Sequence, residues 1–145
     1  MNTRFAVATH LLAFLAFNQE KPVSSQAIAH SLGTHPVVVR RLVGALSTAG
    51  LVRTQLGAGG GALLTKSPHQ VTLLDVYNAM QEPDLFALNN TTPNLNCGVG
   101  GVMQRTLEQF YDGAEQAMRQ ALAAVTLTQV IEQVKTQMPN HSCSQ

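Results

Sequence analysis

Two adjacent arginines, Arg40 and Arg41, are the residues whose chemistry points most clearly to a ligand. A guanidinium group is planar and always charged, and it can bond to guanine or phosphate through two parallel N–H groups. The apolar residues around the pair recur at i, i+3, i+4 and i+7, which is one helix face: Val39, Leu42, Val43 and Leu46. Because both arginines lie off that face, we expect them to contact a polyanion. The alternative is a pair of solvated surface charges.

Several further residues could help to bind a nucleic acid. We expect Arg40 to read a base and Arg41 to hold a phosphate, with the reverse assignment as the alternative. A serine-rich helix start can donate to phosphate or can simply cap the helix. The glycines of a glycine-rich turn can allow positive φ in the turn, or they can let the backbone approach DNA closely. The additional candidates are Ser24, Ser25, Gln26, His35, Val37, Val38, Gly59, Gly60, Gly61, Arg4, Arg53 and Lys66.

Cys97 is the candidate for a sensor group. It precedes a long helix predicted at 99–124, whose N-terminal dipole favours the thiolate, the reactive form of cysteine. Oxidation or alkylation would add charge or bulk beside this helix and could tilt the domains attached to it. The alternative is an unreactive, partly buried cysteine. Cys143 lies far away in the C-terminal segment, so the two cysteines do not make a disulfide framework.

The sequence lacks the patterns of an enzyme, a metal protein or a membrane protein. The five histidines show no ligand spacing with cysteines or carboxylates, so we expect no metal site. The pattern Gly57-x-Gly59-x-x-Ala62 partly matches a dinucleotide fingerprint, but a strand follows it instead of a helix. No apolar run approaches the roughly 20 residues of a membrane helix, and the N-terminal stretch predicts a buried helix rather than a signal peptide. We therefore expect a cytoplasmic protein with reduced thiols, no cofactor and no catalytic activity.

Charge is distributed unevenly along the chain. Residues 1–66 carry six basic side chains and one acidic one, whereas residues 67–145 carry three basic and seven acidic ones. A basic half suits polyanion binding, and an acidic half suits assembly or sensing. The alternative is a chance scatter of few charges, because only 12% of the residues are charged.

Hydrophobic periodicity and chain breakers predict the elements that position these residues. Helices are expected at 3–17, at 24–31, and from Pro36 to just before Gly50, with Gly33 in the turn between the second and third. Two short helices joined by a tight turn, with a basic outward face on the second, are the helix-turn-helix layout.

The following segment predicts a β-hairpin, the "wing" of a winged helix. Two β-like runs, 51–55 and 62–66, flank the glycine-rich turn. A capping box over Thr72–Asp75 then opens a short helix that ends at Met80. The expected fold is therefore mainly α with a small β-hairpin: a winged helix-turn-helix domain followed by a long C-terminal dimerisation helix.

Apolar residues on the long helix are spaced alternately four and three apart, like a coiled-coil seam. The seam consists of Met103, Leu107, Phe110, Ala114, Ala117 and Ala121. A second stripe (Tyr111, Met118, Leu122 and Val125) lies beside it. We expect the second stripe to pack on its own domain and the seam to form a homodimer; the alternative is packing within one chain. The predicted domains are 1–80 for DNA binding, 81–98 for the sensor loop, 99–137 for dimerisation and 138–145 as a disordered tail.

The chain resembles the Rrf-two family of bacterial winged-helix transcription regulators, most closely its YwnA-like branch. The matching pieces include Ile28–Gly33, Val38–Leu42, Ala49–Val52, the wing glycines and the segment Asn94-Leu95-Asn96-Cys97. The resemblance implies a dimer whose third helix enters the major groove of DNA and whose wing reaches the minor groove. Iron–sulfur members of the family carry three closely spaced cysteines before the long helix, and this chain has only Cys97 there.

We expect a sequence-specific DNA-binding transcription regulator that represses genes from a double-stranded operator as a homodimer. Modification of Cys97 by an oxidant or an electrophile would release it from DNA. Two alternatives stay open: a winged-helix protein-interaction module without DNA binding, and an iron–sulfur regulator that takes ligands from elsewhere.

Overall fold

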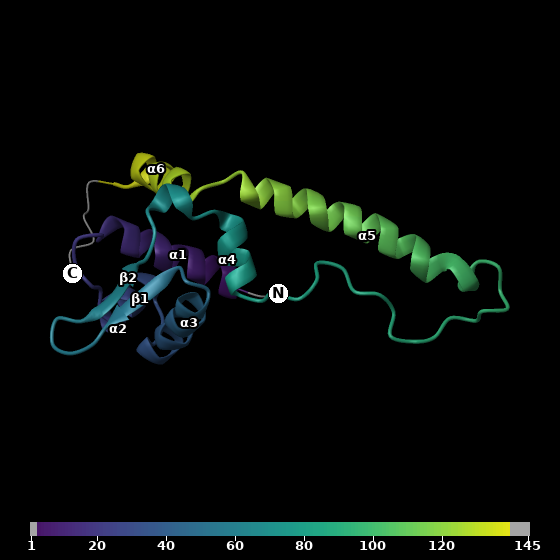
Figure 1. Cartoon of the computed structure of the whole chain (residues 1–145), viewed down its shortest axis with the longest axis horizontal. Helices are drawn as coiled ribbons and strands as arrows, with labels where there is room; N and C mark the ends of the chain where they lie inside the picture. Colours follow the sequence, from purple (N-terminus) through teal and green to yellow (C-terminus); the bar gives the residue numbers. More distant parts are fainter. Residues whose placement is uncertain (1–2, 140–145) are drawn as a thin grey trace.

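The computed structural model describes residues 3–139, which form an α-helical body with a small two-stranded sheet and one long projecting helix (Figure 1). In chain order the elements are α1 (Arg4–Phe17), α2 (Ser25–Leu32), α3 (Pro36–Thr48), β1 (Val52–Gln55), β2 (Gly61–Leu64), the 3-10 helix η1 (Pro68–Gln70), α4 (Leu73–Ala79), α5 (Gly100–Ala123) and α6 (Leu127–Gln137). We call α1–α4, the hairpin and α6 the head. We call α5 and the preceding loop 82–99 the arm.

Helix α1 is the centre of the head. It is apolar on nearly all sides, and such a helix is stable only when it is surrounded by protein. Leu11 and Leu12 are fully buried, together with Ile28 of α2, Leu46 of α3 and Met80 after α4. Helices α2, α3, α4 and α6 and strand β2 all contact α1. The apolar N-terminus is therefore a core helix, as the sequence predicted.

The helix-turn-helix forms through local signals that the sequence contains. The Ser24 hydroxyl accepts a hydrogen bond from the Ala27 amide at 3.2 Å and caps α2. Gly33 ends α2 in the left-handed conformation, with φ of 65°. His35 then occupies the N-cap of α3, and Pro36 stands in its first turn.

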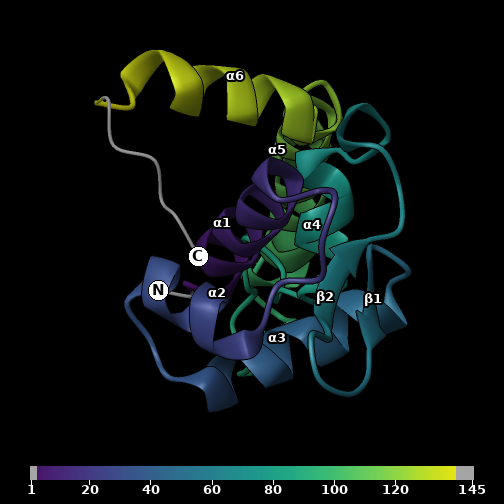
Figure 2. The ribbon, with the colours of Figure 1, turned by 90° about the vertical axis from the view of Figure 1, so that its left-hand side faces the viewer.

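The hairpin is anchored to the body by a third short strand segment. Val52 pairs with Leu64 at the root of the hairpin, and Gln55 pairs with Gly61 at its tip. The Val23 amide donates to the Ala62 carbonyl at 3.0 Å, and the Ala62 amide donates back at 2.8 Å. Val23, which precedes the N-cap of α2, thus extends the sheet and fixes the hairpin relative to the helix-turn-helix. Figure 2 shows α3 and the hairpin along one side of the head, with α6 on the opposite side.

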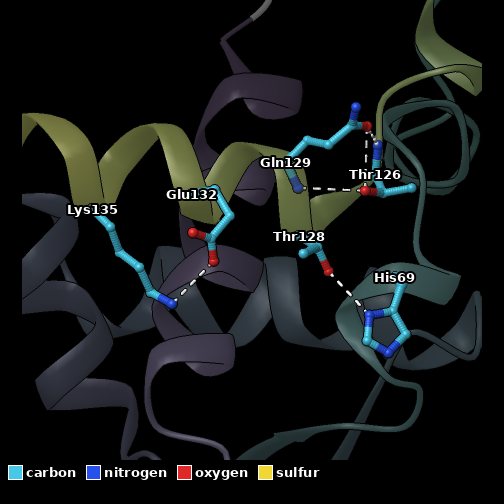
Figure 3. Close-up of polar contacts among 6 residues, drawn as sticks. All are labelled: His69, Thr126, Thr128, Gln129, Glu132 and Lys135. Carbon is cyan, nitrogen blue, oxygen red and sulfur yellow. Dashed lines mark hydrogen bonds and ion pairs between the residues drawn. The ribbon is translucent and has the colours of Figure 1, made fainter.

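Helix α6 returns the chain to the head. The Leu73 amide donates to the Val125 carbonyl at 2.9 Å, and the Leu127 amide donates to the Val71 carbonyl at 2.8 Å, so the starts of α4 and α6 lie side by side. Figure 3 shows the first turn of α6, where the Gln129 side chain accepts from the Thr126 amide at 2.8 Å. It also shows the contact of α6 with η1, in which Thr128 Oγ1 lies 3.4 Å from His69 Nδ1, and the 3.1 Å ion pair of Glu132 with Lys135.

The arm projects from the head as a single helix with the loop running beside it (Figure 1). Helix α5 has 24 residues, about 36 Å at 1.5 Å per residue, and none of them is buried. The Arg119 guanidinium donates to Asn78 Oδ1 of α4 at 2.9 Å and ties its base to the head. Phe86 of the loop stacks on Tyr111, with ring centroids 4.9 Å apart. Residues 140–145, which include Cys143 and most of the predicted tail, lie outside the described part of the chain.

Candidate nucleic-acid interface

The N-terminal half of α3 presents a mixed apolar and basic surface. Val37 is 54% exposed and Val38 is 40% exposed, and both arginines beside them are exposed. The opposite face of α3 is buried in the core through Val39, Leu42, Val43 and Leu46. The helical period therefore places Arg40 and Arg41 on solvent, as predicted.

Within residues 3–139 neither arginine of α3 forms an ion pair. Ion pairs in this part of the chain join Glu115 to Arg119 on α5 and Glu132 to Lys135 on α6. Between residues 3 and 66 the only carboxylate side chain is that of Glu20. The positive charge of α3 is thus left uncompensated by the fold, and an anionic partner can use it.

At the start of α2 and in the turn before α3, fewer side chains are available to bind a nucleic acid than the sequence predicted. Ser24 already uses its hydroxyl as the helix cap, and Ser25 is half-buried. Gln26 and His35 are exposed, and the His35 side chain makes no capping hydrogen bond. These two side chains are therefore the ones available to a ligand.

The glycines of the wing are required for different structural reasons. A Cβ on Gly60 would lie 2.1 Å from the Gln55 carbonyl oxygen, and one on Gly61 would lie 2.2 Å from the Val23 carbonyl oxygen. These glycines are needed by the hairpin itself. Gly59 is exposed with φ of 74°, and Arg53 is exposed on β1.

Sequence reasoning missed Leu56. This side chain is 93% exposed at the tip of the wing. It is a large apolar side chain among residues that are small or polar. The sequence could have indicated it, because a large apolar residue directly before a glycine-rich turn cannot be explained by packing in the core.

Arg4 and Lys66 do not join the group on α3. Both line a cleft whose other walls include Ala45, Thr48 and Ala49 of the C-terminal half of α3. The structure thus separates these two cations from the exposed N-terminal half of the same helix.

Cys97 is exposed in the turn that leads into α5. Hydrogen bonds from the backbone amides of Gly100 and Val99 lower the pKa of its thiol below the ordinary value. The turn is well defined: the Cys97 amide donates to the Asn94 carbonyl at 3.1 Å, and the Asn96 amide donates to Asn94 Oδ1 at 3.0 Å. The helix N-terminus therefore favours the thiolate.

The predicted seam of α5 lies on the surface of the single chain. Met103, Phe110, Ala114, Ala117 and Ala121 are exposed. Leu107 is half-buried and shares a small apolar cavity with loop residues. The second stripe, Tyr111, Met118, Leu122 and Val125, is half-buried throughout. The two apolar faces of α5 are therefore used differently within one chain.

Comparison with known proteins assigns the family. A family model described as Rrf2, iron-dependent transcriptional regulator, matches residues 1–133. The chain belongs to the Rrf2 family. This confirms the resemblance predicted from the sequence. None of the helices described for this Rrf2 protein is long and apolar enough to cross a bilayer.

Individual relatives agree with the family. YwnA of Bacillus subtilis (strain 168), described as an HTH-type transcriptional regulator, is 37% identical over 132 residues, which cover 90% of this chain and 96% of YwnA. A crystal structure described as a DNA-binding protein has a TM-score of 0.72 at 35% identity, over 88% of this chain and 98% of that protein. IscR of T. potens has a TM-score of 0.73 at 22% identity, over 97% of this chain and 93% of IscR, which is a likeness of fold. The winged-helix fold is confirmed.

The described part of the chain has few side chains that could ligate an iron–sulfur cluster. Between residues 3 and 139, Cys97 is the single cysteine, and no three histidine, cysteine or acidic side chains cluster there. An iron–sulfur cluster is held by cysteine thiolates, with histidine as the usual substitute. The side chains of the described residues therefore do not fit a cluster.

Proposed function

We propose that this Rrf2 protein is a cytoplasmic, sequence-specific DNA-binding repressor that acts as a homodimer and has no catalytic activity. The observation that carries the proposal is the exposed, uncompensated pair Arg40 and Arg41 at the N-terminal half of α3. In helix-turn-helix proteins this half of the second helix contacts base edges in the major groove. The similarity to YwnA supports the same function.

The wing would reach the minor groove beside α3. Arg53 would contact phosphate, and the exposed backbone at Gly59 allows close approach. Leu56 at the tip would make an apolar contact with the groove, because apolar wedges are a recurrent way to enter the minor groove.

The dimer would form through the exposed seam of α5. Alanines at positions 114, 117 and 121 allow two helices to approach closely, and Phe110, which is 71% exposed, supplies an apolar anchor. A two-fold dimer implies a palindromic operator, with half-sites about one helical turn apart or a multiple of it.

The test measures operator affinity for Arg40→Ala and Arg41→Ala by gel shift, after selection of bound genomic fragments. We expect a loss of about 1–3 kcal/mol for a base-reading arginine, with relaxed specificity at one base pair. For a phosphate-binding arginine we expect a uniform loss and a salt slope reduced by about one. Arg105→Ala, on the exposed side of α5, is the matched control. Wild-type affinity in both α3 variants would refute the proposal and favour a protein-interaction module.

A second proposal makes Cys97 a switch, supported by its exposure and its stabilised thiolate. Peroxide would oxidise the thiolate to sulfenic acid, or a quinone would form an S–C bond with it. We expect wild-type protein and Cys143→Ser to leave the operator after treatment, and Cys97→Ser to stay bound. An equal response of Cys97→Ser would place the switch elsewhere.

A further inference from the structure

A cleft of about 540 Å³ lies between the head's helices, at the end of α3 that points away from Arg40. Its walls come from the start of α1, the end of α3, the root of the hairpin and the end of α4. Thr48 lies seven residues beyond Arg41, which is about 10 Å along the helix axis. The cleft is therefore separate from the surface proposed to read DNA.

The charged groups of the cleft favour an anion. Arg4, which also takes part in another interaction, and Lys66 line it from segments far apart in the sequence. The one carboxylate in its walls belongs to Asp75, which is engaged in the helix cap: its Oδ2 accepts from the Thr72 amide at 2.9 Å. Asn78 accepts from Arg119 through Oδ1 and keeps its NH₂ group as a possible donor to a ligand.

Part of the remaining wall is apolar and suits a small organic body. Ala45 and Ala49 supply accessible apolar surface, whereas Leu51 and Met80 are buried beneath it. The volume lies in the range of small-molecule sites, roughly 300–1,000 Å³, which combine an apolar wall with a few polar groups. A compact acid with an apolar body matches both properties of the cleft.

We propose that this cleft binds a small organic carboxylate, with Arg4 and Lys66 holding the carboxylate and the alanine side of α3 covering the apolar part. The ligand would touch α3, the root of the wing and Gln81, the second residue after α4, whose φ is 50°. Through Asn78 and Arg119 it would also touch the joint between head and arm.

This position couples the ligand to DNA binding. A ligand that prefers one angle between head and arm shifts the population of that angle, and the change in DNA affinity equals the reciprocal change in ligand affinity. The coupling rests on the proposed DNA-binding function, whereas carboxylate binding itself does not.

The first experiment measures binding by calorimetry and thermal shift with benzoate and hexanoate, with benzamide as the neutral match and inorganic phosphate as the purely inorganic anion. We expect saturable binding of a carboxylate, no binding of benzamide, and about a tenfold or greater loss of affinity in Arg4→Gln/Lys66→Gln. Ala49→Leu, which fills the cleft without changing its charge, should also lose the ligand. Lys21→Gln, an exposed cation outside the cleft, should bind as wild type.

Equal binding by wild type and both cleft variants, or no binding of either acid, would overturn the proposal. Stronger binding of phosphate than of the acids would overturn the organic part of it. A second experiment measures DNA affinity without ligand. A weaker operator complex in Arg4→Gln/Lys66→Gln would assign these cations to the DNA backbone instead. If the wild-type protein binds no DNA at all, the calorimetric result still decides the ligand site.

Discussion

The head and the arm differ in how much of their apolar surface is buried within one chain. In the head, residues of α1, α2, α3 and α4 share one core, and side chains such as Leu11 and Ile28 are fully buried. In the arm, α5 has an apolar seam of comparable periodicity, yet none of its 24 residues is buried. The apolar surface of the head is thus covered within one chain, whereas the arm leaves an apolar seam exposed, as expected for a surface that binds a partner.

The two regions also differ in charge. Helix α3 of the head carries two arginines and no acidic residue, whereas α5 carries two arginines, two glutamates and one aspartate. A polyanion would therefore be attracted to the head, and the arm would be left for association with a second copy. The predictions below test this division, from the largest expected effect to the smallest.

Leu12→Ala tests the head. The side chain is fully buried, so its truncation should destabilise the protein by about 2–5 kcal/mol. Urea unfolding followed by circular dichroism measures the loss. Leu56→Ala, which removes an exposed leucine, should leave the unfolding midpoint unchanged. An equal loss of stability in both variants would contradict the conclusion that the head has a tightly packed core.

Ala117→Glu tests the arm. A carboxylate in a close-packed dimer seam would be desolvated without a partner, at a cost of about 3 kcal/mol, which is over 100-fold in the dimer dissociation constant. Sedimentation equilibrium measures this constant, and circular dichroism should show a folded head. Gln116→Glu, on an exposed neighbouring position, is the matched control. A dimer of unchanged strength in Ala117→Glu would show that the seam is not the interface.

Gly61→Ala should destabilise the head by about 1–3 kcal/mol, because the new Cβ would meet the Val23 carbonyl oxygen and the φ of 153° lies in a region that other residues avoid. Gly113→Ala on α5 meets no atom within 4 Å and should stabilise its helix by about 0.5–1 kcal/mol. The opposite signs, measured by chemical unfolding, contrast the packed hairpin with the open arm.

Leu56→Ala should weaken operator binding by about 1 kcal/mol without changing the salt slope, since an apolar contact releases no counterions. Arg53→Ala should reduce the salt slope by about one. Binding titrations over a range of salt concentrations separate the two. A changed slope in Leu56→Ala would argue against an apolar contact.

Cys97 should be alkylated at lower pH than a cysteine in an unstructured peptide, because the amides of Gly100 and Val99 lower its pKa. The rate follows the thiolate fraction, so it rises with pH and reaches its plateau early. Iodoacetamide labelling of Cys143→Ser protein between pH 6 and 10, read by mass spectrometry, measures the profile. Unfolding in urea should return the profile to that of the peptide.

Most of the head could be predicted because its signals are local. The Ser24 cap, the left-handed Gly33 and the Thr72–Asp75 capping box act over a few residues, and each occurs as expected. The same reasoning found Arg40 and Arg41, because a helical period alone decides that they lie opposite the core.

Prediction was weaker where a residue's role depends on distant chain segments. Gly60 and Gly61 were expected to allow positive φ in the turn or close approach to DNA, but their contacts with the carbonyls of Gln55 and Val23, which also require glycine, were not foreseen. Leu56 was not singled out, although the predicted hairpin already placed it at the turn, because the sequence does not show how far its side chain is exposed. These roles depend on contacts that periodicity does not encode.

The amino-acid order by itself determined the helices, their caps, the wing turn and the two faces of α5, since these follow from backbone preferences and side-chain periods within about ten residues. Tertiary structure alone decided that Arg4 and Lys66 line one cleft, that Val23 extends the hairpin, and that α5 leaves its seam uncovered. The physical reason is that local interactions act through neighbouring residues, whereas clefts and exposed faces depend on how complete helices pack against one another.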